Sequence, residues 1–424
     1  MNTRITNALI IPMDREGHSF IGDIALEGST IKYVGSVGPE FIAHRTIDAT
    51  GYIALPSLFN SHTHLSMGLM RNYKDNEPTL EAWLAQIFPI ENKLQEHDIL
   101  TASRVGIIEA LQSGTGFFLD MYFNAEATAQ AVIEAGLRAN LGLTLFGSIE
   151  DSKARVKRWD TNVSPILNDS LSYSIAPHAI YTCSKETLLY AHDVAKERNV
   201  PLHIHLSETT TENNNCLIEH KKTPLQYLID LGFFADVDVL LAHCVHLSAE
   251  DQELMKGLPA TIIHNPSSNL KLSSGIAPIA TYLEKGLKVL IGTDGASSNN
   301  NLNLFEELHL AALLGRLPHD EAPLVTSYQV LQMATTQAAQ TFGLTSGTLQ
   351  AGYDADILLV NTKKAHLSPL NDPFSALVYS AQGSDVEYLF NRGELLLEKG
   401  QATKIHHDTA LAAIQEVWAD IKTR

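Results

Sequence analysis

Two histidines, His62 and His64, stand two residues apart at the end of an apolar segment that begins at Leu55. Successive side chains of a strand point to opposite faces, so residues spaced by two share one face. Two imidazoles on one face can begin a metal site. A pair of polar residues in a loop after a strand explains the spacing equally well, so the pair alone does not decide between the two.

Three more apolar segments end in side chains that bind metals or transfer protons. One carries His203 and His205 and is followed by Glu208, the next ends at His243, and the last ends at Asp294. The carboxyl ends of parallel strands meet at one edge of a sheet or barrel. Four such segments in chain order therefore indicate one shared site.

Three neutral imidazoles and one carboxylate are a donor set that suits zinc or iron(II) and leaves a position for water. Such an ion lowers the pKa of a bound water toward about 7. We predict one divalent metal ion, with Zn²⁺ as the first choice and Fe²⁺ or Mn²⁺ as alternatives. The predicted ligands are His62, His64, His205 and Asp294. His203 shares the face of His205, so it is either a competing ligand or a neighbour of the ligands.

The middle of the chain must position these side chains, and its pattern is that of repeated βα units. Short apolar segments alternate with amphipathic ones of helical length. The segment Gly116 to Met121 is followed by a predicted helix over Ala125 to Ala135, and a predicted helix over Ile279 to Lys285 precedes Val289 to Gly292. This rhythm predicts a barrel or an open α/β sheet.

Both ends of the chain have strand-and-turn composition. We expect residues 1–56 and 346–405 to form one composite β-sandwich beside a domain over residues 57–345, and a closing helix within residues 406–424, over Ala410 to Thr423. The predicted strands of the composite domain are Asn7 to Pro12, Ile21 to Leu26, Thr30 to Gly35, Tyr52 to Leu55, Val386 to Arg392 and Glu394 to Glu398.

Composition narrows the classes of partner. A net charge of −18 disfavours nucleic acid and anionic membranes, so a small neutral or cationic substrate fits better. We find no apolar run long enough to span a bilayer and read the amino terminus as a first strand, not a signal peptide. Three cysteines without C-x-x-C spacing point to the cytoplasm, namely Cys183, Cys216 and Cys244.

Several longer motifs surround the metal-ligand candidates. They are Ser61-His62-Thr63-His64, Phe118-Leu119-Asp120-Met121-Tyr122, Ala176-Pro177-His178 with Tyr181-Thr182-Cys183-Ser184, His205-Leu206-Ser207-Glu208-Thr209, Ala242-His243-Cys244-Val245-His246, His264-Asn265-Pro266-Ser267-Ser268-Asn269-Leu270-Lys271-Leu272 and Gly292-Thr293-Asp294-Gly295-Ala296-Ser297-Ser298-Asn299. With these motifs the chain resembles the amidohydrolase superfamily, and within it the methylthioadenosine/S-adenosylhomocysteine deaminases and their triazine-hydrolase relatives. The resemblance implies a (β/α)8 TIM-like barrel with a split β-domain.

The resemblance also implies roles for individual residues. It makes Glu208 the proton shuttle, in contact with the substrate, and His243 the hydrogen-bonding partner of the attacking water, while Asp294 relays a proton as well as binding metal. Glu91 is implied to bind a ribose diol and His178 the adenine region. Trp83 is either an aromatic wall of the substrate pocket or a core residue of its helix.

The implied reaction is hydrolytic deamination of adenosine derivatives. The candidates are 5'-methylthioadenosine, S-adenosylhomocysteine, 5'-deoxyadenosine and adenosine, each giving the inosine form and ammonia. The segment Leu171 to Pro177 lacks the lysine that bridges two metals in other superfamily members, which favours a single ion. The chain also lacks the cysteine ligands of cytidine-deaminase-type enzymes.

One departure bears on the substrate. Relatives carry an arginine after the third barrel strand, but here Arg138 precedes that strand and Arg155 lies in a charged stretch that we interpret as solvated surface. Without that arginine, a smaller adenosine derivative is favoured over S-adenosylhomocysteine. Alternatives are a guanine, pyrimidine or triazine aminohydrolase or chlorohydrolase and, more remotely, a metal-free assembly or binding protein. A homo-oligomer is compatible with the resemblance.

Overall fold

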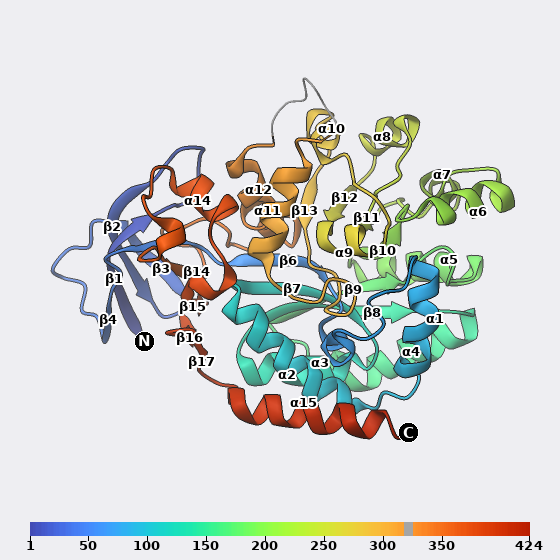
Figure 1. The fold of residues 1–424 in the computed structure, drawn as a ribbon, viewed down its shortest axis with the longest axis horizontal. Coiled ribbons are helices and arrows are strands. Elements are labelled where there is room, and N and C mark those ends of the chain that lie inside the picture. The colour runs from blue at the N-terminus through green and yellow to red at the C-terminus, as the bar shows by residue number, and fades with distance from the viewer. Residues whose placement is uncertain (318–324) are drawn as a thin grey trace.

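The computed structural model describes residues 1–317 and 325–424, and its largest part is a barrel of eight parallel strands (Figure 1). The strands pair in sequence order from β6 to β13. They are β6 (Leu58–Thr63), β7 (Thr115–Tyr122), β8 (Arg138–Leu145), β9 (Leu171–Pro177), β10 (Leu202–Leu206), β11 (Val239–His243), β12 (Ala260–His264) and β13 (Val289–Ile291).

The end of β13 returns to β6 and brings the two ends of the strand order together. The backbone N–H of Asp294 donates to the carbonyl oxygen of His62 over 3.0 Å. A Cβ at Gly292 would lie 2.7 Å from the backbone nitrogen and oxygen of His62, so only glycine permits this approach. The predicted (β/α)8 TIM-like barrel is therefore confirmed, and the open α/β sheet is wrong.

Helices cover the outside of the barrel and bury leucine, isoleucine and valine side chains against its strands. Many begin at a serine or threonine whose side chain accepts a backbone N–H, as Ser184 does from Thr187. The helices are α1 (Leu80–Glu91), α2 (Glu96–Gln112), α3 (Ala125–Ala135), α4 (Ile149–Asn162), α5 (Lys185–Arg198), α6 (Thr210–His220), α7 (Pro224–Asp230), α8 (Ala249–Met255), α9 (Pro266–Lys271), α10 (Ile279–Glu284), α11 (Leu304–Leu314), α12 (Ser327–Met333), α13 (Thr336–Thr341), α14 (Pro373–Tyr379) and α15 (His407–Ile421).

The two ends of the chain share a second, mixed sheet of nine strands beside the barrel (Figure 1). Strand β14 pairs antiparallel with β5, with Leu358 opposite Leu55, so residues about three hundred positions apart build one sheet. The strands are β1 (Asn2–Ile10), β2 (Phe20–Glu27), β3 (Thr30–Gly35), β4 (Arg45–Asp48), β5 (Tyr52–Pro56), β14 (Ile357–Asn361), β15 (Val386–Asn391), β16 (Glu394–Glu398) and β17 (Gln401–Ala402). The boundaries 1–56 with 346–405, 57–345 and 406–424 stay our proposal for the domains.

The predicted first strand is wrong in its bounds, because β1 starts at Asn2 and ends at Ile10. Asn7 has a φ of 61°, and the pairing of β1 with β2 shifts register between Ile5 and Ala8. This bulge interrupts the alternation of apolar residues, which is the signal that locates a strand in a sequence.

Arg138 lies at the first residue of β8, at the opposite end of the strand from the predicted site. Its guanidinium is buried and forms ion pairs with Asp354, over 2.7 Å, and with Asp356. Arg138 thus ties the barrel to the loop before β14, which excludes it as a substrate contact. No helix among the described residues is both long and apolar enough for a membrane span.

Candidate active site

The predicted ligands come together at the carboxyl ends of the barrel strands. Asp294 Oδ1 lies 3.3 Å from His62 Nε2 and 3.1 Å from His64 Nε2. His64 Nε2 in turn lies 3.3 Å from His205 Nε2. His243 belongs to the same cluster, since one ligand atom from each of His62, His205, His243 and Asp294 lies within 4.8 Å of the others.

Backbone carbonyl groups orient two of these imidazoles. His205 Nδ1 lies 2.7 Å from the carbonyl oxygen of His178, and His64 Nδ1 lies 2.5 Å from that of Met121. A carbonyl only accepts, so both Nδ1 atoms carry a hydrogen, and each Nε2 atom presents a lone pair when its ring is neutral. Burial lowers the pKa of His64, but the Asp294 carboxylate outweighs burial and raises that pKa to about 9, so His64 releases a proton when it binds a metal. In the neutral rings, two lone pairs facing each other over 3.3 Å repel unless a cation lies beside them. This donor set therefore fits a divalent metal ion.

His203 is a neighbour of the predicted ligands. Its Nε2 lies 3.0 Å from His62 Nδ1, the ring nitrogen of His62 that faces away from Asp294.

Burial determines the protonation of two of the predicted ligands. It lowers the pKa of His62 to about 4 and holds the pKa of His205 well below its usual value. Both rings are therefore neutral, which is the form that binds a metal.

Asp294 is held by hydrogen bonds on the side away from the histidines. Its Oδ2 accepts from the hydroxyls of Ser268, over 2.6 Å, and Ser298, over 2.8 Å. Asp294 follows β13 with a φ of 60°, a conformation that is uncommon for a residue other than glycine. The two serines leave Oδ1 directed at the imidazoles.

Glu208 and His243 form a second pair beside the cluster. Their Oε2 and Nε2 atoms are 3.7 Å apart, and Glu208 Oε1 accepts from the Ser274 hydroxyl over 3.1 Å. His243 Nδ1 lies 2.8 Å from the side-chain oxygen of Asn269, which fixes the ring. Burial raises the pKa of Glu208, although nearby His243 lowers it. A carboxyl whose pKa is raised in this way is suited to accepting and returning a proton near neutral pH.

A small cavity of about 60 Å³ joins these groups to the predicted substrate contacts. Trp83 lies on α1, is 4% exposed and lines this cavity, so it is both a pocket wall and a core residue. His178 lines the same cavity. Glu91, also on α1, accepts a hydrogen bond from the Tyr122 hydroxyl over 2.8 Å, and burial raises its pKa although Tyr122 lowers it.

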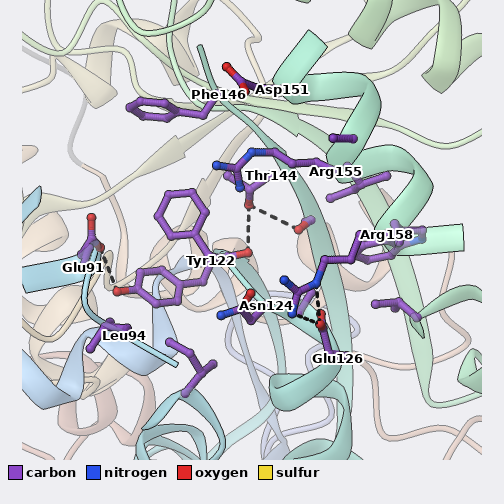
Figure 2. Close-up of a pocket in the computed structure, with 18 of the residues that line it drawn as sticks. Glu91, Leu94, Tyr122, Asn124, Glu126, Thr144, Phe146, Asp151, Arg155 and Arg158 are labelled. Atoms are coloured by element: carbon purple, nitrogen blue, oxygen red, sulfur yellow. Dashed lines mark hydrogen bonds and ion pairs between the residues drawn. The ribbon is translucent and has the colours of Figure 1, made fainter. Parts of the chain in front are cut away.

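A larger cavity of about 570 Å³ shares part of its wall with the first one, and Figure 2 shows residues that line it. Both are lined by Glu91, Tyr122, Thr144 and Phe146, which stand between them. Figure 2 shows the guanidinium of Arg155 reaching toward Thr144 from α4. We refer to the small cavity as the reaction cavity and to the large one as the tail cavity.

The interpretation of Arg155 as solvated surface is wrong. Its guanidinium carbon lies 4.9 Å from the centre of the Phe123 ring, and the side chain lines the tail cavity. Across residues 1–317 and 325–424 we find no ion pair of Arg155 with a carboxylate, whereas Arg158 on the same helix is bound to Glu126. Arg155 is thus a half-buried cation without a fixed counter-ion.

The sequence profile of the amidohydrolase family matches residues 53–396. The chain belongs to the amidohydrolase family. It is 40% identical to a 5-methylthioadenosine/S-adenosylhomocysteine deaminase of Caldanaerobacter subterraneus subsp. tengcongensis over 94% of each chain. It is 37% identical to a 5'-deoxyadenosine deaminase of Methanocaldococcus jannaschii over 95% of this chain and 97% of that protein.

Solved structures agree with this assignment. An adenosine deaminase of Xanthomonas campestris with bound zinc superposes with a TM-score of 0.93 at 26% identity, covering 100% of this chain and 99% of that one. An atrazine chlorohydrolase of Arthrobacter aurescens TC1 complexed with zinc has a TM-score of 0.90 at 25% identity, covering 98% of this chain and all of that one. The resemblance is confirmed, as are a hydrolase acting on carbon–nitrogen bonds and a site for one divalent metal, with zinc favoured.

Sequence reasoning gave no role to several residues of this amidohydrolase that hold the site together. Ser268 and Asn269 lie in a motif that marked the family, and Tyr122 ends another, so those motifs were the available signal. Ser298 lies in the motif around Asp294, whereas Ser274 had no signal of comparable strength, because a serine near an active site is too common to single out. Their partners became visible only in the folded chain.

Proposed function

We propose that this amidohydrolase removes the 6-amino group of adenosine derivatives by hydrolysis, giving the inosine form and ammonia. The observation that carries the proposal is the reaction cavity, where His64, Glu208, His243 and Asp294 share one space with Glu91. A partly buried carboxylate such as that of Glu91 is a suitable acceptor for the two hydroxyls of a ribose. The names of the relatives, which are deaminases of methylthioadenosine, S-adenosylhomocysteine and 5'-deoxyadenosine, support the same class of substrate.

The proposed ligands of the metal are His62, His64, His205 and Asp294. When bound there, a divalent ion lowers the pKa of water and so supplies a nucleophile at neutral pH. His243 forms a hydrogen bond with the attacking oxygen, and the hydrogen bond between its Nδ1 and the side-chain oxygen of Asn269 keeps the ring oriented.

Glu208 transfers the first proton in this mechanism. As the oxygen of water bonds to C6, Glu208 takes a proton from that water and gives it to the adjacent ring nitrogen, which accepts the electrons of the ring. Asp294 then takes the remaining proton of the added oxygen and passes it to the amino group. The bond from C6 to that nitrogen breaks, the C6 oxygen becomes a carbonyl, and ammonia leaves. His178 and Trp83 confine the ring, and Glu91 holds the ribose.

The tail cavity supports a substrate that extends beyond the 5' position. The shared walls at Glu91 and Thr144 suggest that a ribose bound in the reaction cavity directs its 5' substituent toward Arg155. An unpaired, half-buried guanidinium is a good receptor for a carboxylate. We therefore propose that S-adenosylhomocysteine, with its acidic end, is a substrate alongside methylthioadenosine. Because Arg155 lines the tail cavity, the lack of an arginine no longer favours smaller derivatives.

The decisive experiment measures ammonia release with adenosine, 5'-deoxyadenosine, methylthioadenosine, S-adenosylhomocysteine, guanine and an aminotriazine. We expect turnover of the adenosines and at least about tenfold lower kcat/KM for guanine and the triazine. The variant Glu208→Gln serves as control, since it should retain bound zinc and lose turnover. Activity on the triazine or guanine alone would overturn the proposal, and metal-free, inactive protein would revive a non-enzymatic role.

The cysteines and the net charge bear on where the protein acts and what it binds. All three cysteines are buried and free, which suits a reducing compartment, and we propose the cytoplasm. We also propose that the partners are limited to small molecules and exclude nucleic acid, because the net charge of −18 repels polyanions. A homo-oligomer stays a prediction.

A further inference from the structure

Glu212 is a buried carboxyl group in the first turn of α6, the helix that follows Glu208. Its Oε2 accepts the backbone N–H of Glu208 over 2.7 Å. Its own backbone N–H donates to the side chain of Thr209 over 3.1 Å. Glu212 therefore touches the chain on both sides of the turn that carries the proposed proton shuttle.

This bond differs from that of an ordinary capping residue. In a capping box the acidic side chain accepts the N–H of the N-cap residue itself, as Asp251 does from Ser248 over 3.0 Å at the start of α8. The N-cap of α6 is Thr209, yet the 2.7 Å bond of Glu212 goes to the preceding residue, Glu208.

The turn before α6 needs such support. Ser207 follows the end of β10 with a φ of 49°, in the left-handed region that residues other than glycine seldom adopt. Its carbonyl oxygen accepts the N–H of His246 over 2.9 Å. The N–H groups of Ser207 and Thr209 also face the Glu212 carboxyl and lower its pKa, although burial is the larger effect and raises that pKa to about 8.

The side chain of Glu208 has few contacts of its own. Ser274 donates to its Oε1 over 3.1 Å, while its Oε2 faces His243 at 3.7 Å. The direction of this carboxylate thus depends on where the backbone of residue 208 sits. A displacement of about 1 Å in a reacting group can reduce a rate about 100-fold.

We propose that Glu212 is a positioning residue for the reaction, which holds the backbone of Glu208 so that the Glu208 carboxylate meets the reacting atoms. The proposal rests on the proposed deamination and adds a residue to which neither the family motifs nor the predicted mechanism gave a role. Glu212 itself lies behind the turn and contacts no substrate in this scheme.

Three substitutions separate positioning from simple stability. Glu212→Ala removes the acceptor, and we expect kcat for methylthioadenosine to fall about 100-fold with KM changed less than about threefold. Glu212→Gln keeps an oxygen acceptor of the same reach and should stay within about threefold of the wild-type kcat. Asp251→Ala is the matched control, because it removes a buried capping carboxyl after β11; it should lower the melting temperature comparably and leave kcat within about twofold.

A double-mutant cycle tests whether Glu212 acts through Glu208. In the Glu208→Gln background, the added Glu212→Ala substitution should change the residual kcat by less than about twofold. The same 100-fold loss in both backgrounds would overturn the proposal. So would loss of bound zinc from Glu212→Ala in proportion to the lost activity, measured by elemental analysis, or a kcat equal to that of Asp251→Ala.

A shorter acidic side chain and the wild-type protein supply two further comparisons. If Glu212→Ala does not fold, Glu212→Asp replaces it; the shorter side chain withdraws the acceptor, and at least a tenfold lower kcat is expected, with an unchanged kcat overturning the proposal. Wild-type protein in the same ammonia assay tests the deaminase function by itself. Failure of the wild type refutes that function, whereas an active wild type with an equally active Glu212→Ala refutes only the positioning role.

Discussion

The reaction cavity and the tail cavity adjoin each other but are built from different parts of the fold. Around the reaction cavity, side chains at strand ends are fixed by second partners, as Asp294 is by Ser268 and Ser298. In the tail cavity, Arg155 extends from a helix and rests on one aromatic ring. The difference indicates that the strands determine the chemistry, while the helices and loops around them select the substrate.

The largest loss of activity is expected from a substitution in the reaction cavity, at Asp294. Asp294→Ala removes a proposed ligand and leaves the Ser268 hydroxyl without its acceptor, while the Ser298 hydroxyl keeps the carbonyl oxygen of Gly295 at 3.0 Å. A metal ion contributes several kcal/mol to such a reaction, so kcat should fall at least about 1,000-fold. Elemental analysis should show less than one zinc per chain. A variant with full zinc and near-normal turnover would contradict the proposed ligand set.

A smaller effect is expected at Glu91, which belongs to both cavities. Hydrogen bonds to a charged group contribute about 1.5–3 kcal/mol, so Glu91→Gln should lower kcat/KM for methylthioadenosine about tenfold to 150-fold. The control is a substrate without the diol, a 2',3'-dideoxyadenosine derivative, whose kcat/KM should change less than about threefold. Equal losses for both substrates would show that Glu91 does not bind the ribose.

The tail cavity should respond in a more selective way. Arg155→Met keeps a side chain of similar length and removes the charge, and we expect kcat/KM for S-adenosylhomocysteine to fall about tenfold to 30-fold. Methylthioadenosine has no acidic end, so its kcat/KM should stay within about twofold. Arg158→Met is the matched control, because Arg158 is already paired with Glu126; a loss of equal size there would refute the assignment of Arg155.

The two cavities also differ in how much of them could be predicted from the sequence. His62 and His205 lie near the ends of apolar strands and Asp294 follows one, and strand alternation with parallel pairing is enough to bring such residues together. Arg155 follows no strand, and the charged residues around it are typical of a solvated helix face. Its contact with Phe123 depends on how α4 packs over the end of β7, which the local pattern does not encode.

The elements of the fold also differ in how well the sequence predicts them. Helix α3 and strands β3 and β16 have the predicted bounds, because a regular periodicity and clear turn residues define them. The start of β1 was missed owing to the bulge at Asn7. Non-local ties such as Arg138 with Asp356 leave no trace in the local pattern, since both partners look like ordinary charged residues until the ends of the chain meet.

The last prediction concerns the stability of the residues around the reaction cavity and not the chemistry within it. Glu307 on α11 connects helix α9 with the loop after β13, the two segments that hold Asp294. Its Oε2 accepts the N–H of Ser267 over 3.1 Å and its Oε1 accepts from the Asn299 amide over 2.7 Å. Burial raises the pKa of Glu307 to about 8, although these hydrogen bonds lower it. In the unfolded chain a glutamate has a pKa of about 4.3.

The folded protein therefore binds a proton at Glu307 that the unfolded chain has released between about pH 5 and pH 8. In that window the free energy of unfolding falls as the pH rises, by at most about 1.4 kcal/mol for each pH unit from this group. Glu307→Gln removes the group, so its stability relative to the wild type should increase from pH 5 to pH 8, measured by denaturant unfolding with zinc held constant. A constant difference across that window would mean that Glu307 is ionised in the folded protein and that its hydrogen bonds outweigh its burial.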